Sequence, residues 1–366
     1  MSMHPARRKA KGLSLVELMI AILIGTILLL GLVQIYAATR ESYRLSEGMS
    51  RVQENGRFAL DFLQRDIRLA GHFGCMNDQA RIQMEATAGT GAGNVLSSHP
   101  TAALLNFRFS IQGFDGPPPF AATLNPAPLA ASDSIILRFL TGEGVPVTGI
   151  NAAAGTITVD NAKWDVLTFG GVATPELFGI ADCTFADVFA AQLPVTGPTI
   201  VAPGVLLDQR YTADVGGGPA SLYRAEALVY YIGNGAGGQP SLFRARLDRN
   251  GNPPPVSEEL VEGIDNMQLR YGMAGTNANG EPNGNVQSQG TATEVTAAAA
   301  WPLVGQVQVA LLASSPNVAS AQQVDAAFAA NRVPNLLGVA PVVPNDRRYR
   351  SVYQSTIALR NRLYGN

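Results

Sequence analysis

The sequence predicts an α+β protein in which a long N-terminal helix packs on a β-rich, antiparallel globular domain. Three observations lead to this fold class. An apolar run covers residues 13–33, and a helical stripe of apolar residues continues it to residue 70. After residue 75, short segments of alternating polar and apolar residues are separated by turns rich in Gly and Pro.

The apolar run is long enough to cross a membrane. Its 21 residues contain only three polar side chains, Ser14, Glu17 and Thr26. At about 1.5 Å per residue they span about 31 Å, roughly the thickness of a bilayer core. Four basic residues precede the run, which places the N-terminus in the cytoplasm and the bulk of the chain outside it. These are Arg7, Arg8, Lys9 and Lys11.

The processing mark of this segment lies before the apolar run. An ordinary secretory signal has a shorter apolar core with a small-x-small cleavage site after it. Here Lys11-Gly12 precedes Leu13-Ser14-Leu15-Val16-Glu17, and this pattern resembles the class III prepilin signal of type IV pilins and type II secretion pseudopilins. Major pilins usually carry Phe where this chain has Leu13, a position at which minor members vary. The resemblance implies cleavage by prepilin peptidase between Gly12 and Leu13, and N-methylation of Leu13.

Glu17 is a carboxylate near the start of the apolar helix. A charge at the bilayer centre costs on the order of 2.5–3.5 kcal/mol by insertion scales, so we expect a compensating partner. The resemblance implies that this partner is the methylated amine of Leu13 in a neighbouring subunit, since two buried charges are tolerated when they satisfy each other. Glu17 would then set the register of assembly. The alternative is a plain signal anchor in which Glu17 is incidental.

The helix continues beyond the membrane. Apolar or small residues recur at spacings of three and four, while charged residues occupy the opposite face. No proline interrupts residues 13–71, and Gly71 with His72 is a stop signal. A helix of about 59 residues, close to 88 Å long, is predicted. Gly48 and Gly56 are expected to weaken it where it leaves the membrane. The stripe consists of Leu45, Met49, Val52, Gly56, Ala59, Leu63, Ile67 and Ala70.

We therefore divide the chain into a leader (1–12), an N-terminal helix (13–72, with 13–36 in the membrane or filament core) and a β-rich periplasmic domain (73–366). Strands are predicted at 134–140, 155–159, 267–272 and 305–312, with a hairpin of 227–232 and 241–247 and a final strand within 348–362. Residues 256–263 are predicted to form a short helix or turn. Residues 274–300, rich in Asn, Gly, Ala and Thr, are predicted to be a flexible, exposed loop.

Two regions extend the resemblance to a subfamily. The segment from Arg57 to Cys75, the order of the segments between residues 222 and 312, and the C-terminal segment are similar to PilW-type minor pilins. Residues 76–220 match no family pattern. The C-terminal arginines, Arg348, Arg350, Arg360 and Arg362, could meet acidic neighbours, but a solvated strand edge is favoured.

The two cysteines, Cys75 and Cys183, would lie in an oxidising compartment if the topology is right. A Cys75–Cys183 disulfide is the simpler interpretation, and two buried free thiols are the alternative. The bridge would tie the end of the helix to the middle of the body.

No catalytic constellation is visible. The three histidines, His4, His72 and His99, are scattered, and no nucleophile set, phosphate loop or CxxC pair occurs. Residues 248–252 have the oxygen spacing of the start of a calcium loop but lack the later acidic ligand, so a turn is favoured. We predict no metal and no cofactor. Four aromatic residues, Tyr230, Tyr231, Phe243 and Tyr271, are expected to pack in the core.

Composition excludes a nucleic-acid surface. The chain has 26 Lys+Arg and 28 Asp+Glu, and loss of the leader with its four basic residues brings the net charge from −2 nearer to −6. We expect a non-enzymatic minor pilin, anchored in the inner membrane, that joins other minor pilins and the major pilin to prime a pilus near its tip, in twitching and adhesion. The alternatives are a minor pseudopilin of type II secretion and a signal-anchored periplasmic enzyme or adhesin.

Overall fold

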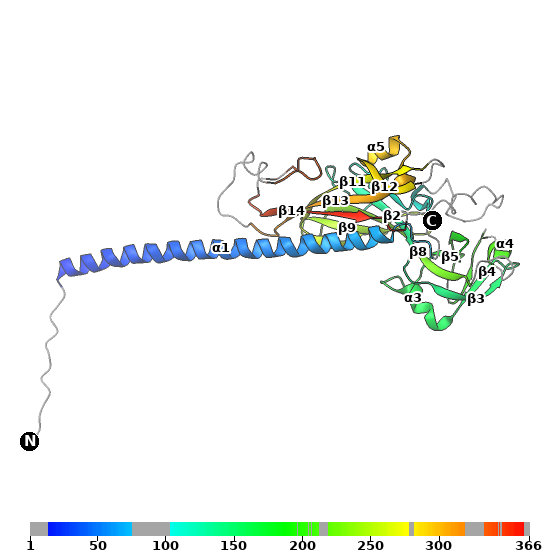
Figure 1. The fold of residues 1–366 in the computed structure, drawn as a ribbon. Helices are drawn as coiled ribbons and strands as arrows, with labels where there is room; N and C mark the ends of the chain where they lie inside the picture. The colour runs from blue at the N-terminus through cyan, green and yellow to red at the C-terminus, as the bar shows by residue number, and fades with distance from the viewer. Residues whose placement is uncertain are drawn as a thin grey trace, which may run out of the picture.

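A computed structural model of the chain describes residues 14–74, 103–195, 197–203, 205, 207–211, 219–277, 282–318, 333–342, 344 and 346–361. A single long helix, α1 (Leu15–Leu69), projects from a β-rich body (Figure 1). The predicted α+β class is confirmed. The predicted leader, with Gly12 and Leu13, lies outside the described residues, as do Cys75 and His99.

Helix α1 has 55 residues and follows the predicted stripe. Its apolar face is buried against the body from Val52 to Ile67, and the charged face opposite is exposed. The helix ends at Leu69 because Gly71, with φ of 77°, turns the chain. The helix predicted over 13–72 is observed from Leu15 to Leu69, so it ends three residues earlier than expected.

The body contains two antiparallel sheets. One is four-stranded in the order β12-β11-β13-β14. Its strands are β11 (Ile264–Thr276), β12 (Pro282–Gly290), β13 (Val304–Ser314) and β14 (Arg350–Ala358). The buried stripe of α1 packs against β13 and β14.

The larger sheet is ten-stranded and follows the path β1-β2-β8-β3-β4-β7. Strands β9 and β5 also pair with β8, β10 pairs with β9, and β6 pairs with β5. Its strands are β1 (Ile111–Phe114), β2 (Ser134–Leu140), β3 (Val145–Asn151), β4 (Thr156–Val159), β5 (Leu177–Ala181), β6 (Ala186–Ala190), β7 (Thr199–Val201), β8 (Ser221–Asn234), β9 (Pro240–Arg246) and β10 (Glu258–Glu262).

Short helices connect these strands. They are α3 (Trp164–Thr168), α4 (Leu207–Arg210) and α5 (Ala292–Ala297), with 3-10 turns η2 (Ala103–Leu105), η3 (Ala121–Thr123), η4 (Asn161–Lys163) and η5 (Trp301–Leu303).

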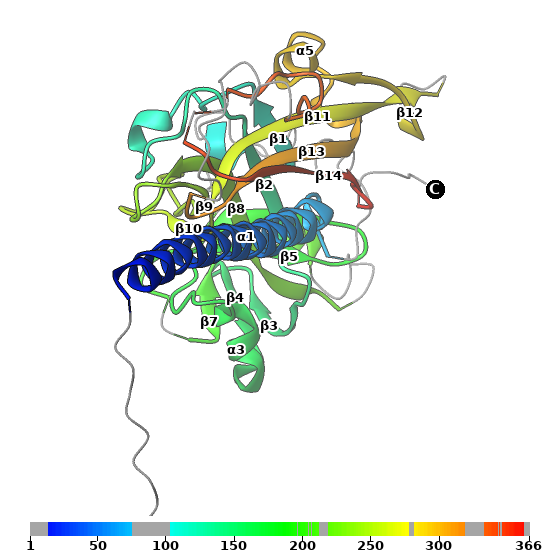
Figure 2. The ribbon, with the colours of Figure 1, turned by 90° about the vertical axis from the view of Figure 1, so that its left-hand side faces the viewer.

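The elements from β3 to α4 form a separate lobe, which we call the insert lobe. Viewed along α1, the helix lies between the four-stranded sheet on one side and the insert lobe on the other (Figure 2). The insert lobe has its own core, in which Phe178 stacks on Phe189 at 6.2 Å between ring centroids. This lobe falls within the stretch that matched no family pattern.

Two segment predictions are wrong. Residues 258–262 form strand β10 rather than a helix or turn, because Val261 is buried and the strand pairs with β9. Residues 274–300 are not a flexible loop over their described part. They contain the end of β11, strand β12 and helix α5, which starts with a capping box between Thr291 and Glu294. Their polar composition reflects an exposed edge strand.

The prediction that the C-terminal arginines lie on a solvated strand edge is wrong at Arg348 and Arg350. Arg348 lies 3.5 Å from a carboxylate oxygen of Asp346, and Arg350 is paired more closely. The guanidinium of Arg350 lies 2.7 Å from carboxylate oxygens of both Asp265 and Asp346, and its side chain is 4% exposed. The other strand predictions, including the hairpin of β8 and β9, are confirmed. The four aromatic residues expected in the core are buried, and Tyr231 stacks on Phe243 at 5.7 Å.

Candidate functional site: the exposed helix and its seat on the body

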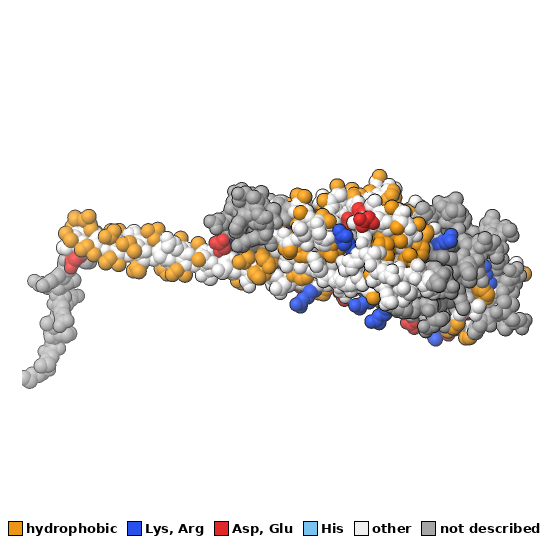
Figure 3. Space-filling model, turned by 45° about the horizontal axis from the view of Figure 1, so that its top comes forward, with side chains coloured by type: hydrophobic (Ala, Val, Ile, Leu, Met, Phe, Trp, Pro, Cys, Tyr) orange, Lys and Arg blue, Asp and Glu red, His pale blue; other side chains and the backbone are white. Residues whose placement is uncertain are grey.

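The first half of α1 is an uncovered apolar rod. Large apolar side chains from Leu15 to Tyr36 are 51% to 74% exposed, and they cover the thin part of the molecule (Figure 3). Among the described residues, α1 is the helix that is long and apolar enough to cross a membrane. Apolar area of this size needs a bilayer or other helices to cover it.

Glu17 lies in the first turn of this rod and is held there by a capping box. The backbone N–H of Ser14 donates to Glu17 Oε2 at 2.9 Å, and the N–H of Glu17 donates to Ser14 Oγ at 3.2 Å. The carboxylate also lies at the positive end of the helix dipole. The Ser-x-x-Glu spacing is a sequence signal for this box, and it could have predicted the start of the helix at Ser14. Leu13 lies outside the described residues, so its pairing with Glu17 stays a prediction.

The second half of α1 is seated on the body by close packing. A Cβ at Gly56 would overlap the ring of Tyr353 on β14. The glycine is therefore present for close approach between helix and sheet, and the expectation that it only weakens the helix is corrected. Polar contacts add to the seat: Asn55 Nδ2 donates to the carbonyl of Glu262 at 2.9 Å, and Gln64 Nε2 to Ser355 Oγ at 2.8 Å.

A buried carboxylate, Asp66, links α1 to the larger sheet. It is 3% exposed and accepts a hydrogen bond of 2.5 Å from the hydroxyl of Tyr230 on β8. Arg244 on β9 lies 3.5 Å from the same oxygen, and the Nε of Arg65 lies 3.1 Å from the other. Burial, followed by the Asp66 charge, raises the pKa of Tyr230. Asp66 was not predicted as a site residue, although its spacing from Leu63 places it on the buried face.

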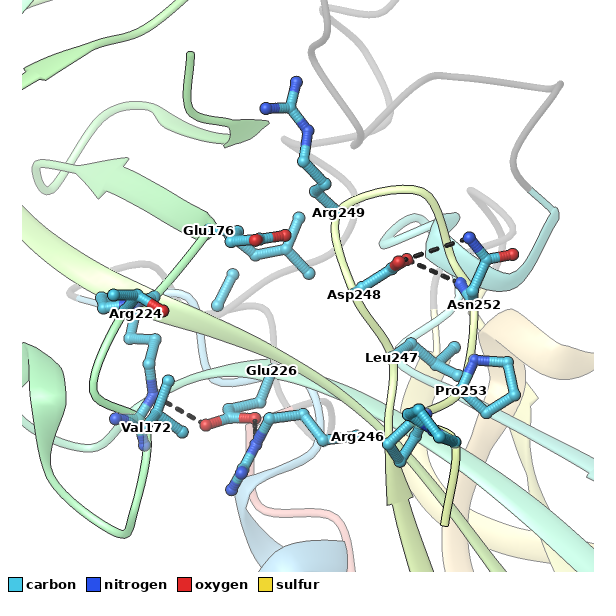
Figure 4. Close-up of a pocket in the computed structure, with 16 residues that line it drawn as sticks. Val172, Glu176, Arg224, Glu226, Arg246, Leu247, Asp248, Arg249, Asn252 and Pro253 are labelled. Carbon is cyan, nitrogen blue, oxygen red and sulfur yellow. Dashed lines mark hydrogen bonds and ion pairs between the residues drawn. The ribbon is translucent and has the colours of Figure 1, made fainter. Parts of the chain in front are cut away.

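A groove of about 850 Å³ lies beside Asp66, between α1, the larger sheet and the insert lobe. A smaller pocket of about 280 Å³ lies next to it (Figure 4). The two share Arg224, Glu226 and Arg246. Glu226 is held between the two arginines, at 2.7 Å from the Nε of each. This buried ion-pair network is therefore internally satisfied.

The region after the helix approaches the part of the body that carries Cys183. A Cβ at Gly74 would lie 3.0 Å from the Cβ of Ala181, the last residue of β5. Cys183 is disulfide-bonded, and the described residues contain no free cysteine. Cys75 lies outside the described residues, so its pairing with Cys183 stays a prediction.

The remaining candidates for chemistry have structural roles. Asp248 Oδ1 accepts hydrogen bonds from the backbone N–H groups of Asn250 at 2.8 Å and Asn252 at 2.7 Å, which is a turn. His72 Nδ1 lies 2.9 Å from the carbonyl oxygen of Leu140 at the base of the insert lobe. Over the described part of the chain, no group of three or more His, Cys, Asp or Glu side chains is placed to hold a metal.

Two family models match the chain at the features described above. The prokaryotic N-terminal methylation motif matches residues 7–33, which include Glu17 and the start of the exposed rod. The model of type IV pilus-assembly protein W matches residues 229–361, from within β8 to the end of β14. The chain therefore carries a PilW domain at residues 229–361 and a prepilin methylation motif at residues 7–33. The insert lobe lies outside both matched ranges.

Among curated proteins, none matches the chain. A solved structure, a type IV-like pilin from Thermus thermophilus, shares 14% identity with it over 56% of this chain and 93% of that one. The TM-score of this match is 0.22, too low to support an argument about the fold.

Proposed function

We propose that this pilin is a minor subunit that primes assembly of a type IV pilus together with other minor pilins and the major pilin, at or near the filament tip. The observation that carries the proposal is the methylation motif at residues 7–33, which leads into an exposed apolar helix with Glu17 in its first turn. Prepilin peptidase cleaves between Gly12 and Leu13, and Leu13 is then N-methylated.

Assembly depends on charge pairing between Glu17 and the Leu13 amine of a neighbouring subunit. The capping box engages Glu17 Oε2, and Oε1 accepts a hydrogen bond from that amine. Pairing removes the cost of two separately buried charges. Because the apolar faces of the helices have no strong register of their own, this pair fixes the axial position of one helix on another.

The topology follows from the same segment. The leader (1–12) stays in the cytoplasm, the helix (13–72) crosses the inner membrane with residues 13–36, and the body (73–366) lies in the periplasm until the subunit enters the filament. PilW-type pilins are structural proteins, and a filament subunit needs neither a catalytic site nor a cofactor.

The first test is the N-terminal mass of the full chain extracted from membranes of cells with and without prepilin peptidase. We expect a chain that begins at methylated Leu13 when the peptidase is present, and an intact leader when it is absent. An intact leader in both strains would overturn processing and leave a plain signal anchor.

The second test addresses Glu17 itself. Glu17→Ala should abolish pilus assembly while the chain remains processed and stable in the membrane. The matched control is Glu54→Ala, which removes an exposed carboxylate farther along the same helix and should assemble normally. Normal function of the Glu17→Ala variant would favour an anchored enzyme or adhesin instead.

The PilW match favours the pilus over a type II secretion system. A strain that lacks this chain should lose twitching and surface adhesion and keep its levels of secreted enzymes. Normal twitching with lost secretion would contradict the proposal and assign the chain to the pseudopilins.

A further inference from the structure

The groove beside the end of α1 is built from three separate parts of the molecule. One wall is the helix, the floor is the larger sheet, and the other wall is the insert lobe, which lies on the opposite side of α1 from the four-stranded sheet (Figure 2). Its volume of about 850 Å³ is in the range of pockets that take a ligand or an anchoring side chain. The insert-lobe wall includes Asp165, Val166, Phe169 and Gly170.

Phe169 stands at the rim of this groove and is 77% exposed. The backbone that carries it is held from inside the protein. One terminal nitrogen of Arg224, a residue only 6% exposed, donates to the carbonyls of Leu167 at 2.8 Å and Phe169 at 2.5 Å. Glu226 in turn holds Arg224. A large aromatic ring kept in solvent on a fixed loop is typical of an interface anchor, since little order is lost when it binds.

The helix wall continues the apolar surface. Phe62 and Leu69 line the groove and are half-buried, and Phe58, one turn before Phe62, is 54% exposed. The guanidinium of Arg65 lies over the ring of Phe62, with 5.7 Å from its carbon to the ring centroid. These residues recur at helical spacing, so they form one stripe that leads from the exposed side of α1 into the groove.

The charge available to a partner in the groove is negative. All four arginines that line the groove are paired with buried carboxylates: Arg65 and Arg244 with Asp66, and Arg224 and Arg246 with Glu226. Glu143, in the turn between β2 and β3, and Asp165, on α3 of the insert lobe, also line the groove. Their carboxylates are exposed and have no ion-pair or hydrogen-bond partner among the described residues. A complementary partner therefore offers Lys or Arg beside an apolar side chain.

We propose that this groove docks a neighbouring pilin subunit through a segment in which an apolar side chain lies next to Lys or Arg. The inference rests on the proposed function, because it takes the partner from the same filament complex. Phe58 is on α1 itself, so a partner that covers it must lie alongside the helix, where the next subunit stands in such a complex. The insert lobe would then be a specificity element added to the PilW body.

The test is photocrosslinking of the full chain in its own cells, with a benzophenone amino acid placed at position 169. We expect a covalent adduct with another pilin. The matched control is the same substitution at Val342, which is 80% exposed and lies outside the groove, and it should give no such adduct. No adduct at position 169, an adduct with a protein that is not a pilin, or equal adducts at both positions would overturn the proposal.

A second measurement separates the groove from the general role in assembly. The double variant Glu143→Lys/Asp165→Lys should reduce co-purification with the partner pilin at least tenfold, and Phe169→Ser should do the same. Glu262→Lys, a charge reversal on the exposed face of β10, should not. Removal of the leader should be unchanged in all of them. The docking proposal would be wrong if the groove variants bound the partner fully while processing and the dependence on Glu17 were normal. That outcome would leave the proposed role in assembly unaffected.

Discussion

Asp66 is a carboxylate that the fold buries where α1 meets two strands of the larger sheet. Tyr230 and Arg244 satisfy one of its oxygens and Arg65 the other, so the charge is tolerated. Asp66→Asn keeps the size of the side chain and removes the charge. We expect it to lower the free energy of unfolding by about 1.5–3 kcal/mol, the range for hydrogen bonds to charged groups.

Urea unfolding of the detergent-solubilised full chain, followed by tryptophan fluorescence, measures this loss. Asp61→Asn, on the exposed face of the same helix, is the control and should change stability by about 0.5 kcal/mol or less. Equal effects of the two substitutions would show that the buried network does not hold the helix.

Asp133 gives the body a dependence on pH. It is 7% exposed, and its oxygens accept hydrogen bonds from the N–H groups of Gly116 at 3.1 Å and Leu269 at 2.8 Å. Burial, and secondly the charge of Asp115, raises its pKa from 3.8 to about 6. Because the folded pKa is higher than the unfolded one, the contribution of this group is fully present below pH 4 and is lost as the pH rises through 6, an effect of about 2–3 kcal/mol.

Asp133→Asn should therefore flatten the fall in stability between pH 4 and pH 7, whatever it does to the absolute value. The urea midpoint of variant and parent at pH 4, 5, 6 and 7 measures the two slopes. If the urea midpoints of variant and parent changed with pH in parallel, the pH dependence would come from other groups.

Single residues were predictable where the chemistry is local. Glu17 stands out in the sequence because a carboxylate interrupts an apolar run, and Gly71 because it follows the last buried position of a helix. Asp66 and Arg224 did not stand out, and the partner of Arg350 could not be named, since the residues that contact them come from distant segments. The pairing of Arg350 with Asp265, for example, joins two strands that both pair with β13.

At the scale of elements, the seat of α1 on β14 depends on the absence of a side chain at Gly56. Gly56→Ala places a methyl group against the ring of Tyr353 and should lower the free energy of unfolding by about 1–3 kcal/mol, as overpacking does. The gain in helix propensity of up to about 1 kcal/mol offsets only part of this.

The double variant Gly56→Ala/Tyr353→Leu tests the mechanism, because a smaller side chain at 353 should recover part of the loss. Gly25→Ala is the control: nothing lies within 4 Å of a Cβ at that position, so the unfolding of the body should be unchanged. If the stability loss of the double variant equalled the sum of the losses of the two single variants, the contact between positions 56 and 353 would not explain the effect of Gly56→Ala.

Elements that form a short, nearly continuous apolar run were predicted almost to the residue. Strand β2 at Ser134–Leu140, which is buried at every position, is an example. The strand predictions failed where few or none of the strand's side chains are buried. Strand β12 is exposed along most of its length, so its Asn- and Gly-rich sequence carries no alternation, and only pairing with β11 makes it a strand. Strand β10 has a single buried side chain, Val261, and is extended because its backbone pairs with β9.

On the scale of the whole molecule, the chain is a rod joined to a body, and this division was predictable because hydropathy changes along the helix. The arrangement of the insert lobe was not predictable. It depends on the pairing of β3 and β5 with β8, which begins more than forty residues after the start of either strand. No local sequence pattern predicts pairings between segments so far apart.

A disulfide bond is predicted to link the long helix to the insert lobe. The chain leaves α1 at Leu69 and passes Ala181 at Gly74, so a bridge from Cys75 to Cys183 would close a long loop between the two parts. Cys183→Ser should lower the free energy of unfolding by about 2–4 kcal/mol and make the body sensitive to proteolysis.

Mass spectrometry of the unreduced, thiol-blocked chain identifies the bridge directly, because a linked pair of peptides containing Cys75 and Cys183 should appear in the parent and disappear on reduction. Val342→Ser, a change of an exposed residue, controls for the introduction of a serine. Alkylation of both thiols without prior reduction would contradict the pairing. In that case the position of the insert lobe would be set by the pairing of β3 and β5 with β8 and by the contacts of Arg224 with Leu167 and Phe169.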